Sequence, residues 1–145
     1  MDRKIILLVE DNEDDVKLTL NAFKEENIEN KVKVINDGEE ALDFIFGTGK
    51  YEGDEGVSSI AVVLLDIKLP KVDGLEILKR IRADERTKLL PVVILTSSKE
   101  EQDIINGYKL GCNSYVRKPV EFDKFSKEVK ELGMYWLLIN EPPIK

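Results

Sequence analysis

Residues 60–74 read IAVVLLDIKLPKVDG, and this stretch decides the fold. It opens with an unbroken apolar run rich in β-branched side chains, which is typical of a strand buried on both faces of a parallel sheet. Asp66 follows the run, and Pro70 and Asp73-Gly74 supply turn residues before a segment with helical spacing. The stretch therefore predicts a strand, a polar turn and a helix, in that order.

The same pattern recurs along the whole chain. Runs rich in β-branched residues predict five strands, at Ile5–Val9, Val32–Ile35, Ile60–Leu65, Val92–Leu95 and around Tyr115-Val116. Helical spacing of apolar residues predicts a helix after each strand, over 16–23, 41–45, 75–81, 104–108 and 122–132. This alternation predicts right-handed crossovers and a doubly wound α/β domain of three layers.

Composition limits the classes of function. The chain has 145 residues, 42% hydrophobic and 35% charged, which suits one domain with its own core and differs from a disordered chain. No apolar run is long enough to span a bilayer or to act as a secretory signal. Because the net charge is −7 and the basic residues are scattered, we expect no binding to nucleic acid. We expect a cytoplasmic domain that binds no membrane.

Two residue types restrict the chemistry. The chain contains no histidine, which removes an imidazole base, a histidine metal ligand and a phosphohistidine of its own. Cys112 is the only cysteine, so it forms no internal disulfide and no zinc site of the usual spacing. We therefore expect carboxylates, hydroxyls and lysines to carry any chemistry, in a reducing compartment.

Polar residues follow four of the five predicted strands. They are Glu10 and Asp11 after the first, Asp66 after the third, Thr96 at the end of the fourth and Lys118 after the fifth. Because parallel strands end at one edge of a sheet, we expect these side chains to converge there. Three carboxylates about 4 Å apart repel by roughly 4 kcal/mol per pair at an effective dielectric near 20, so the site requires a cation.

Oxygen ligands without histidine or thiolate indicate Mg²⁺ or Mn²⁺. Such a donor set suits phosphoryl transfer, in which a metal and a lysine neutralise oxygens of the transferring group while a hydroxyl hydrogen-bonds another. Asp66 is then the predicted nucleophile, and Thr96 and Lys118 are its partners.

Each of these residues also has an ordinary structural interpretation. Any of the polar residues 11–13 could cap the helix that begins near Asp14. Asp66 could be a turn residue, Thr96 a hydroxyl at a strand end, and Lys118 a solvated cation before a proline. Their joint occurrence at the ends of four strands favours the functional interpretation.

Four segments resemble the signature segments of response-regulator receiver domains of two-component signalling. They are ILLVEDNEDD (6–15), VVLLDIKLPKVDG (62–74), PVVILTSS (91–98) and GCNSYVRKP (111–119). The resemblance covers essentially the whole chain and implies a (βα)5, flavodoxin-like or CheY-like sandwich with a parallel sheet of strand order 2-1-3-4-5. We expect a receiver domain at 1–133 and a C-terminal extension at 134–145, with no separate output domain.

The resemblance implies a role for each residue around Asp66. Asp66 is the phosphoacceptor, and it binds Mg²⁺ or Mn²⁺ together with Glu10, Asp11 and the backbone carbonyl of Lys68. The side chain of Lys68 adds a cation beside the site, where it would affect the lifetime of the phosphoryl group.

The resemblance also implies a switch. Lys118 contacts the phosphoryl group, Thr96 moves toward it and Tyr115 turns inward. The surface formed by the fourth helix, the fifth strand and the fifth helix then changes its partners. The alternative for Tyr115 is simple packing, which is common for an aromatic residue in the last strand.

The function implied by the resemblance is that of a single-domain response regulator. A sensor histidine kinase would transfer a phosphoryl group from its phosphohistidine to Asp66, and an unidentified downstream protein would receive the signal. Such a protein is a phosphoacceptor and not an enzyme acting on other molecules, although it catalyses its own phosphorylation and slow dephosphorylation. The alternative is an intermediate phosphorelay shuttle, or a phosphate sink without its own output.

Two segments add to this interpretation. Residues 47–59 are irregular and glycine-rich, and we expect a mobile loop there rather than a functional one. Apolar spacing continues from Phe122 to Ile139, which would allow a homodimer, while the alternative is that this helix faces the core and the tail packs locally. Together these segments give a weaker resemblance to stand-alone regulators of phytochrome-type kinases.

Three rival functions fit parts of the pattern. A flavodoxin-like module holding FMN needs a phosphate-binding loop after the first strand, where this chain places acidic residues that repel phosphate. A metal-dependent phosphatase generally carries its nucleophile after the first strand and not after the third. A receiver acting only as a scaffold would lack part of the residue set that is present here. We therefore favour the phosphoacceptor.

Overall fold

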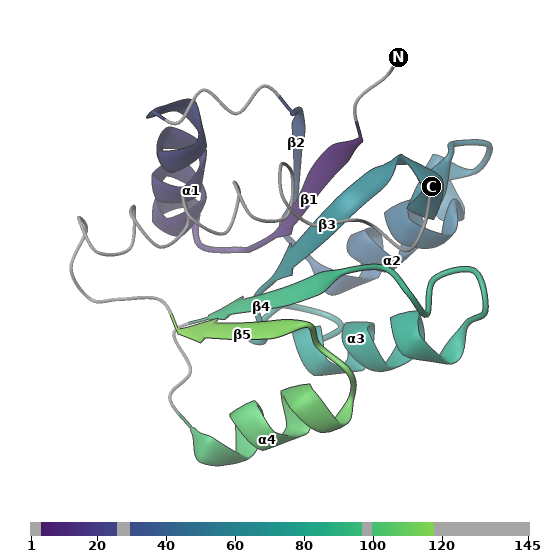
Figure 1. The fold of residues 1–145 in the computed structure, drawn as a ribbon. Helices are drawn as coiled ribbons and strands as arrows, with labels where there is room; N and C mark the ends of the chain where they lie inside the picture. The colour runs from purple at the N-terminus through teal and green to yellow at the C-terminus, as the bar shows by residue number, and fades with distance from the viewer. Residues whose placement is uncertain (1–3, 26–29, 97–99, 118–145) are drawn as a thin grey trace.

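The apolar runs become the strands of one sheet, and the segments with helical spacing become helices packed on it (Figure 1). The computed structural model describes residues 4–25, 30–96 and 100–117. The helices and strands in these ranges are β1 (Ile5–Val9), α1 (Glu13–Glu25), β2 (Val32–Ile35), α2 (Gly38–Phe46), β3 (Ile60–Leu65), α3 (Gly74–Ala83), β4 (Val92–Thr96), α4 (Glu101–Lys109) and β5 (Ser114–Arg117).

Some predicted features lie outside the described residues. They are the fifth helix with its apolar series, the extension at 134–145 and Lys118. Within the described ranges, no helix combines the length and the apolar character needed to cross a bilayer.

All neighbouring strands pair in parallel, and their order is β2-β1-β3-β4-β5. The predicted fold class and strand order are therefore confirmed. The chain first moves outward from β1 to β2, then returns across β1 to β3 and continues to the opposite edge. The direction changes between β1 and β3, and ligands of open α/β sheets bind at the carboxyl end of such a switch point.

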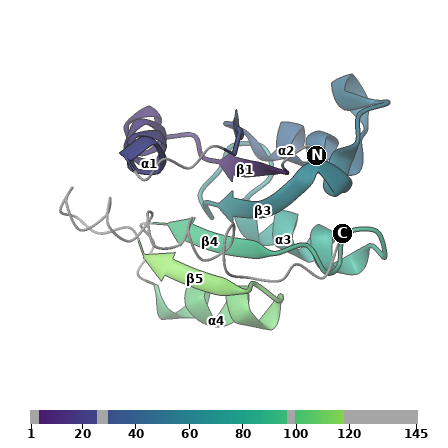
Figure 2. The same cartoon turned by 45° about the horizontal axis from the view of Figure 1, so that its top comes forward.

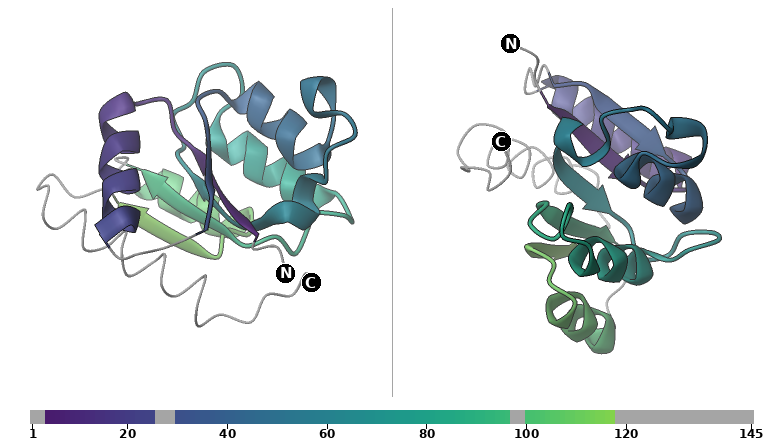
Figure 3. Two further views of the ribbon diagram at one scale, coloured as in Figure 1. Left: turned by 90° about the horizontal axis from the view of Figure 1, so that it is seen from above. Right: turned by 90° about the vertical axis from the view of Figure 1, so that its right-hand side faces the viewer.

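Successive residues of the central strands face opposite sides of the sheet, and both sides are buried. Figures 2 and 3 show α1 on one side of the sheet and α2 and α3 on the other. The side facing α2 and α3 carries Leu7, Val9, Val63, Leu65, Val92 and Ile94. The side facing α1 carries Ile6, Leu8, Val62, Leu64, Val93 and Leu95. Burial on both faces explains why these strands lack the polar alternation of a half-exposed sheet.

Side-chain caps begin the helices that follow β1, β2 and β3. The Asn12 side chain accepts from the amide of Asp15 at 3.1 Å at the start of α1. Asp37 and Asp73 cap α2 and α3 in the same way. The capping role that the sequence left open among residues 11–13 therefore belongs to Asn12.

Residues 47–59 fold into two short 3₁₀ helices, η1 (Gly49–Tyr51) and η2 (Gly56–Ser59). The expected mobility of this stretch stays a prediction. Four glycines in this stretch have positive φ, which allows the tight turns that connect these two short helices to their neighbours.

Tyr51 attaches this segment to α2. Its ring meets that of Phe44 edge-on, with centroids 5.0 Å apart, and its hydroxyl donates to the carboxylate of Glu40 at 2.6 Å. Burial and this hydrogen bond raise the pKa of Tyr51 to about 12. The hydrogen bond in turn lowers the pKa of Glu40, so the pair is a neutral phenol with a carboxylate at neutral pH.

Arg82, in the last turn of α3, joins several segments at the end of the sheet opposite the site. Its guanidinium donates to the carbonyls of Lys88, Leu90 and Gly111 and to the side-chain oxygen of Asn113, over 2.8 to 3.0 Å. The segments leading into β4 and β5 are therefore held by one side chain.

We predict that Arg82→Met lowers the free energy of unfolding by roughly 3 kcal/mol, because it removes four charge-assisted hydrogen bonds, two of them to partly buried carbonyls, while keeping the apolar stem. Urea denaturation measures this loss. Arg80→Met is the control, since it breaks only an exposed ion pair with Glu76, worth about 0.5 kcal/mol. Equal losses in the two variants would contradict the role given to Arg82.

Candidate functional site

Acidic side chains meet where β1 and β3 end. Val9 and Leu65 are register partners, and the amide of Asp66 donates to the carbonyl of Val9 at 3.1 Å. Glu10 and Asp66 therefore follow in neighbouring positions at the carboxyl edge of the sheet. One carboxylate oxygen from each of Glu10, Asp11 and Asp66 lies within 4.8 Å of the other two.

The cluster is partly sealed from water. Glu10 is 3% exposed and Asp66 7% exposed, whereas Asp11 faces solvent. The backbone amide of Asn12 donates to Glu10 at 3.2 Å. At about 5 Å and an effective dielectric near 20, each carboxylate pair still repels by roughly 3 kcal/mol. A donor set made only of carboxylate oxygens, open to solvent on one side, fits Mg²⁺ or Mn²⁺.

Thr96 is the last residue of β4, and it reaches across to Asp66. Its hydroxyl donates to Oδ1 of Asp66 at 2.5 Å, and both side chains are buried. This hydrogen bond holds one carboxylate oxygen and thereby limits the orientation of the other. The structure thus brings together Glu10, Asp11, Asp66 and Thr96, four of the residues that the sequence singled out.

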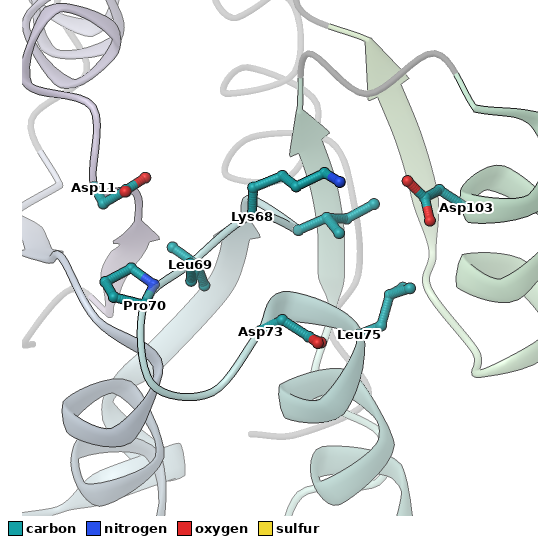
Figure 4. A pocket seen from close by; sticks show the side chains of 8 residues that line it. Asp11, Lys68, Leu69, Pro70, Asp73, Leu75 and Asp103 are labelled. Carbon is teal, nitrogen blue, oxygen red and sulfur yellow. The ribbon is translucent and has the colours of Figure 1, made fainter.

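A cavity of about 550 Å³ opens beside the cluster (Figure 4). The residues around it are Asp11, Ile67, Lys68, Leu69, Pro70, Asp73, Leu75 and Asp103. Lys68 comes from the segment between β3 and α3, and its side chain extends toward Asp103 on α4 in Figure 4. The lining of the cavity therefore combines one lysine and three carboxylates with four apolar residues.

Of the other two predicted residues, the structure describes Tyr115 but not Lys118. Tyr115 lies in β5, is half-buried and packs against the core beneath α4, where a Cβ added to Gly107 would come within 3.2 Å of its ring. Its proposed movement stays a prediction. Lys118 lies outside the described residues, and its contact with the phosphoryl group likewise stays a prediction.

Sequence reasoning did not single out Asp103 or Gly38. Asp103 is an acidic residue in the first turn of a helix, which is an ordinary position for one, so only its place in the cavity marks it. Gly38 had a usable signal, because Asp37-Gly38 repeats the Asp73-Gly74 pair that ends the turn after Asp66. Both pairs begin helices beside the site.

Fold and site together define a class: a doubly wound α/β domain with an acidic, cation-compatible site at the switch point of its sheet. A family model described as the response regulator receiver domain matches residues 6–130. The chain belongs to this family, whose members are signalling proteins. The resemblance identified from the sequence is therefore confirmed.

The similarity to known relatives covers nearly the whole chain. Probable methanogenesis regulatory protein FilR2 of Methanothrix harundinacea is 40% identical over 96% of this chain and 87% of its own length. Response regulator Rcp1 of Synechocystis sp. is 36% identical over 92% of this chain and 89% of its own length. The Mn²⁺-bound structure of Rcp1 has a TM-score of 0.89, covering 97% and 99% of the two chains. The phosphorylated cyanobacterial phytochrome response regulator RcpA is 34% identical, with a TM-score of 0.90 over 98% and 99%.

Repulsion within the cluster predicts that Asp66→Asn raises the stability of the metal-free protein. We expect a gain on the order of 1 kcal/mol, a fraction of the repulsion, because the amide removes one of three charges and still accepts from Thr96. Thermal unfolding in a chelator measures the gain. Asp14→Asn, which removes a charge outside the cluster, should give no gain, and a loss of stability in Asp66→Asn would contradict the repulsion.

Proposed function

We propose that this chain is a response regulator that accepts a phosphoryl group on Asp66 from a partner histidine kinase, in the presence of Mg²⁺ or Mn²⁺. One observation carries the proposal: Asp66 is a buried carboxylate, hydrogen-bonded by Thr96 and grouped with two further carboxylates at the switch point of the sheet. A turn residue or a helix cap would need neither the threonine nor the other acids.

In the proposed transfer, an oxygen of the Asp66 carboxylate attacks phosphorus, the bond from phosphorus to the kinase imidazole nitrogen breaks, and the imidazole leaves with the electron pair. Glu10, Asp11 and the Lys68 carbonyl would hold the cation, which supplies positive charge for the phosphoryl oxygens when it is bound. Thr96 presents a hydroxyl, and Lys118 would add an ammonium group.

The relatives support the proposal by what their names state. The RcpA structure is that of a phosphorylated protein, and one Rcp1 structure contains Mn²⁺. Both align with this chain over nearly its full length. We therefore expect a phosphoryl group and a divalent cation at the Asp66 cluster.

The proposal includes a switch. Thr96 would move toward the phosphoryl group and Tyr115 would turn inward, which changes the surface around α4 and β5.

The proposal also includes the domain boundaries. The receiver domain would occupy residues 1–133, with 134–145 as its C-terminal extension. RcpA is named for a phytochrome and FilR2 for methanogenesis, so these names point to no single input signal for this chain.

Phosphorylation is tested with Mg²⁺ and acetyl phosphate, followed by intact mass measurement. We predict that the wild type gains a single phosphoryl group and that Asp66→Asn gains none. Asp37→Asn is the matched control, because Asp37 is not among the residues that line the cavity and asparagine caps α2 as well as aspartate does. An unmodified wild type, or equal modification of Asp66→Asn, would refute the proposal.

We further propose that the phosphorylated protein forms a homodimer through the surface of α4, β5 and the predicted fifth helix, or through the C-terminal extension. On α4, Ile105 is 39% exposed and Tyr108 55% exposed, and their spacing places both on one face of the helix. Such apolar exposure is typical of contact surfaces when it is contiguous.

For the α4 surface, we predict that phosphorylation shifts gel-filtration elution to twice the monomer mass and that Tyr108→Glu abolishes the shift. Burying a carboxylate in an apolar contact costs several kcal/mol, which explains the direction. Leu89→Glu, on an equally exposed leucine away from α4, should dimerise like the wild type. Identical elution of the two phosphorylation states would exclude phosphorylation-dependent dimerisation.

A further inference from the structure

The segment between β3 and α3 contains a left-handed residue that is not glycine. Lys71 has φ of 68°, and within the described ranges it is the only non-glycine residue with positive φ. The amide of Val72 donates to the carbonyl of Pro70 at 2.8 Å, which closes a tight turn around Lys71. A long side chain rarely adopts this conformation, and it persists only where the surroundings hold it.

The first residue of α2 provides that support. The amide of Gly38 donates to the same Pro70 carbonyl at 3.2 Å. A Cβ added to Gly38 would lie 1.8 Å from the carbonyl oxygen of Val72 and 2.9 Å from its Cβ. The start of α2 thus lies so close to the turn that any side chain larger than hydrogen would push the turn away.

The other end of the segment is held in a similar way. A Cβ added to Gly74 would lie 2.1 Å from the carbonyl oxygen of Asp66, and the amide of Gly74 donates to Ile67 at 2.8 Å. Gly74 therefore fixes the segment next to the phosphoacceptor, and Gly38 fixes it at Pro70 and Val72. Lys68 lies between these two points.

The requirement for glycine at position 38 comes from this contact and not from the helix. Alanine has a higher helix propensity than glycine at a helical position. The start of α2 is already capped by Asp37, whose side chain accepts from Glu40 at 2.7 Å. The contact with the turn is the remaining feature that excludes a side chain.

We infer that Gly38 is a positioning residue for the cation site: through Pro70 and Val72 it sets the path of the segment that presents the Lys68 carbonyl. The inference rests on the proposed function, because it takes the cation site as real. Displacing the turn would move a ligand that is two residues away from Pro70, and small displacements of supporting groups weaken metal sites strongly.

The test is Mn²⁺ binding in the absence of any phosphoryl donor, measured from the electron paramagnetic resonance signal of free Mn²⁺. We expect Gly38→Ala to raise the Kd for Mn²⁺ by roughly tenfold or more. Gly56→Ala is the matched control. It also introduces a strained Cβ, 2.9 Å from the carbonyl of Ile45, but at the opposite end of α2, and it should bind Mn²⁺ like the wild type.

A second variant covers the case in which Gly38→Ala does not fold. Lys71→Gly still allows the turn to form, because glycine adopts positive φ freely. It makes the segment between β3 and α3 more flexible, however. We expect its thermal unfolding midpoint to stay near that of the wild type while its Kd for Mn²⁺ rises.

The outcomes separate the two proposals. A wild type that binds no Mn²⁺ would count against the cation site and hence the proposed function. A wild type that binds Mn²⁺, together with a folded Gly38→Ala of unchanged Kd, would overturn the positioning role alone. If Gly38→Ala is unfolded, an unchanged Kd in Lys71→Gly overturns it instead.

Discussion

The parallel pairing of β1 with β3 is the constraint on which the rest of this structure depends. Its register sets Val9 beside Leu65, so the residues that follow, Glu10 and Asp66, meet at one edge. The two strands are buried on both faces, and each buried aliphatic side chain contributes about 1.5 to 3 kcal/mol. This core compensates for the repulsion among carboxylates that the same pairing creates.

Features that depend on local pattern and on topology rules could be predicted from the sequence. Continuous apolar runs located the strands to within a residue, since strands buried on both faces have no polar alternation. Convergence of Asp66 and Thr96 followed from the rule that parallel strands end at the same edge. The rule predicts proximity but no distance, so the 2.5 Å hydrogen bond between them required the structure.

Features that depend on contacts between distant segments could not be predicted. Three adjacent polar residues were equivalent as caps of α1, and only the backbone path selected Asn12. Residues 47–59 looked irregular because 3₁₀ turns held by Tyr51 and Glu40 leave no periodic pattern. Arg82 resembled an ordinary cation at a helix end, and its four oxygen partners come from segments 6 to 31 residues away.

The site combines two features that oppose folding: clustered carboxylates and a left-handed lysine in the adjoining turn. Each is tolerated because a rigid element lies directly behind it, the sheet behind Asp66 and the start of α2 behind the turn. Strain of this kind marks functional positions, where a surrounding frame holds a geometry that the local chain would not choose. We expect a cation bound at the cluster to offset the repulsion while the sheet and the start of α2 keep their positions. We therefore expect a change that loosens these supporting elements, even far from Asp66, to act first on the binding of charged ligands.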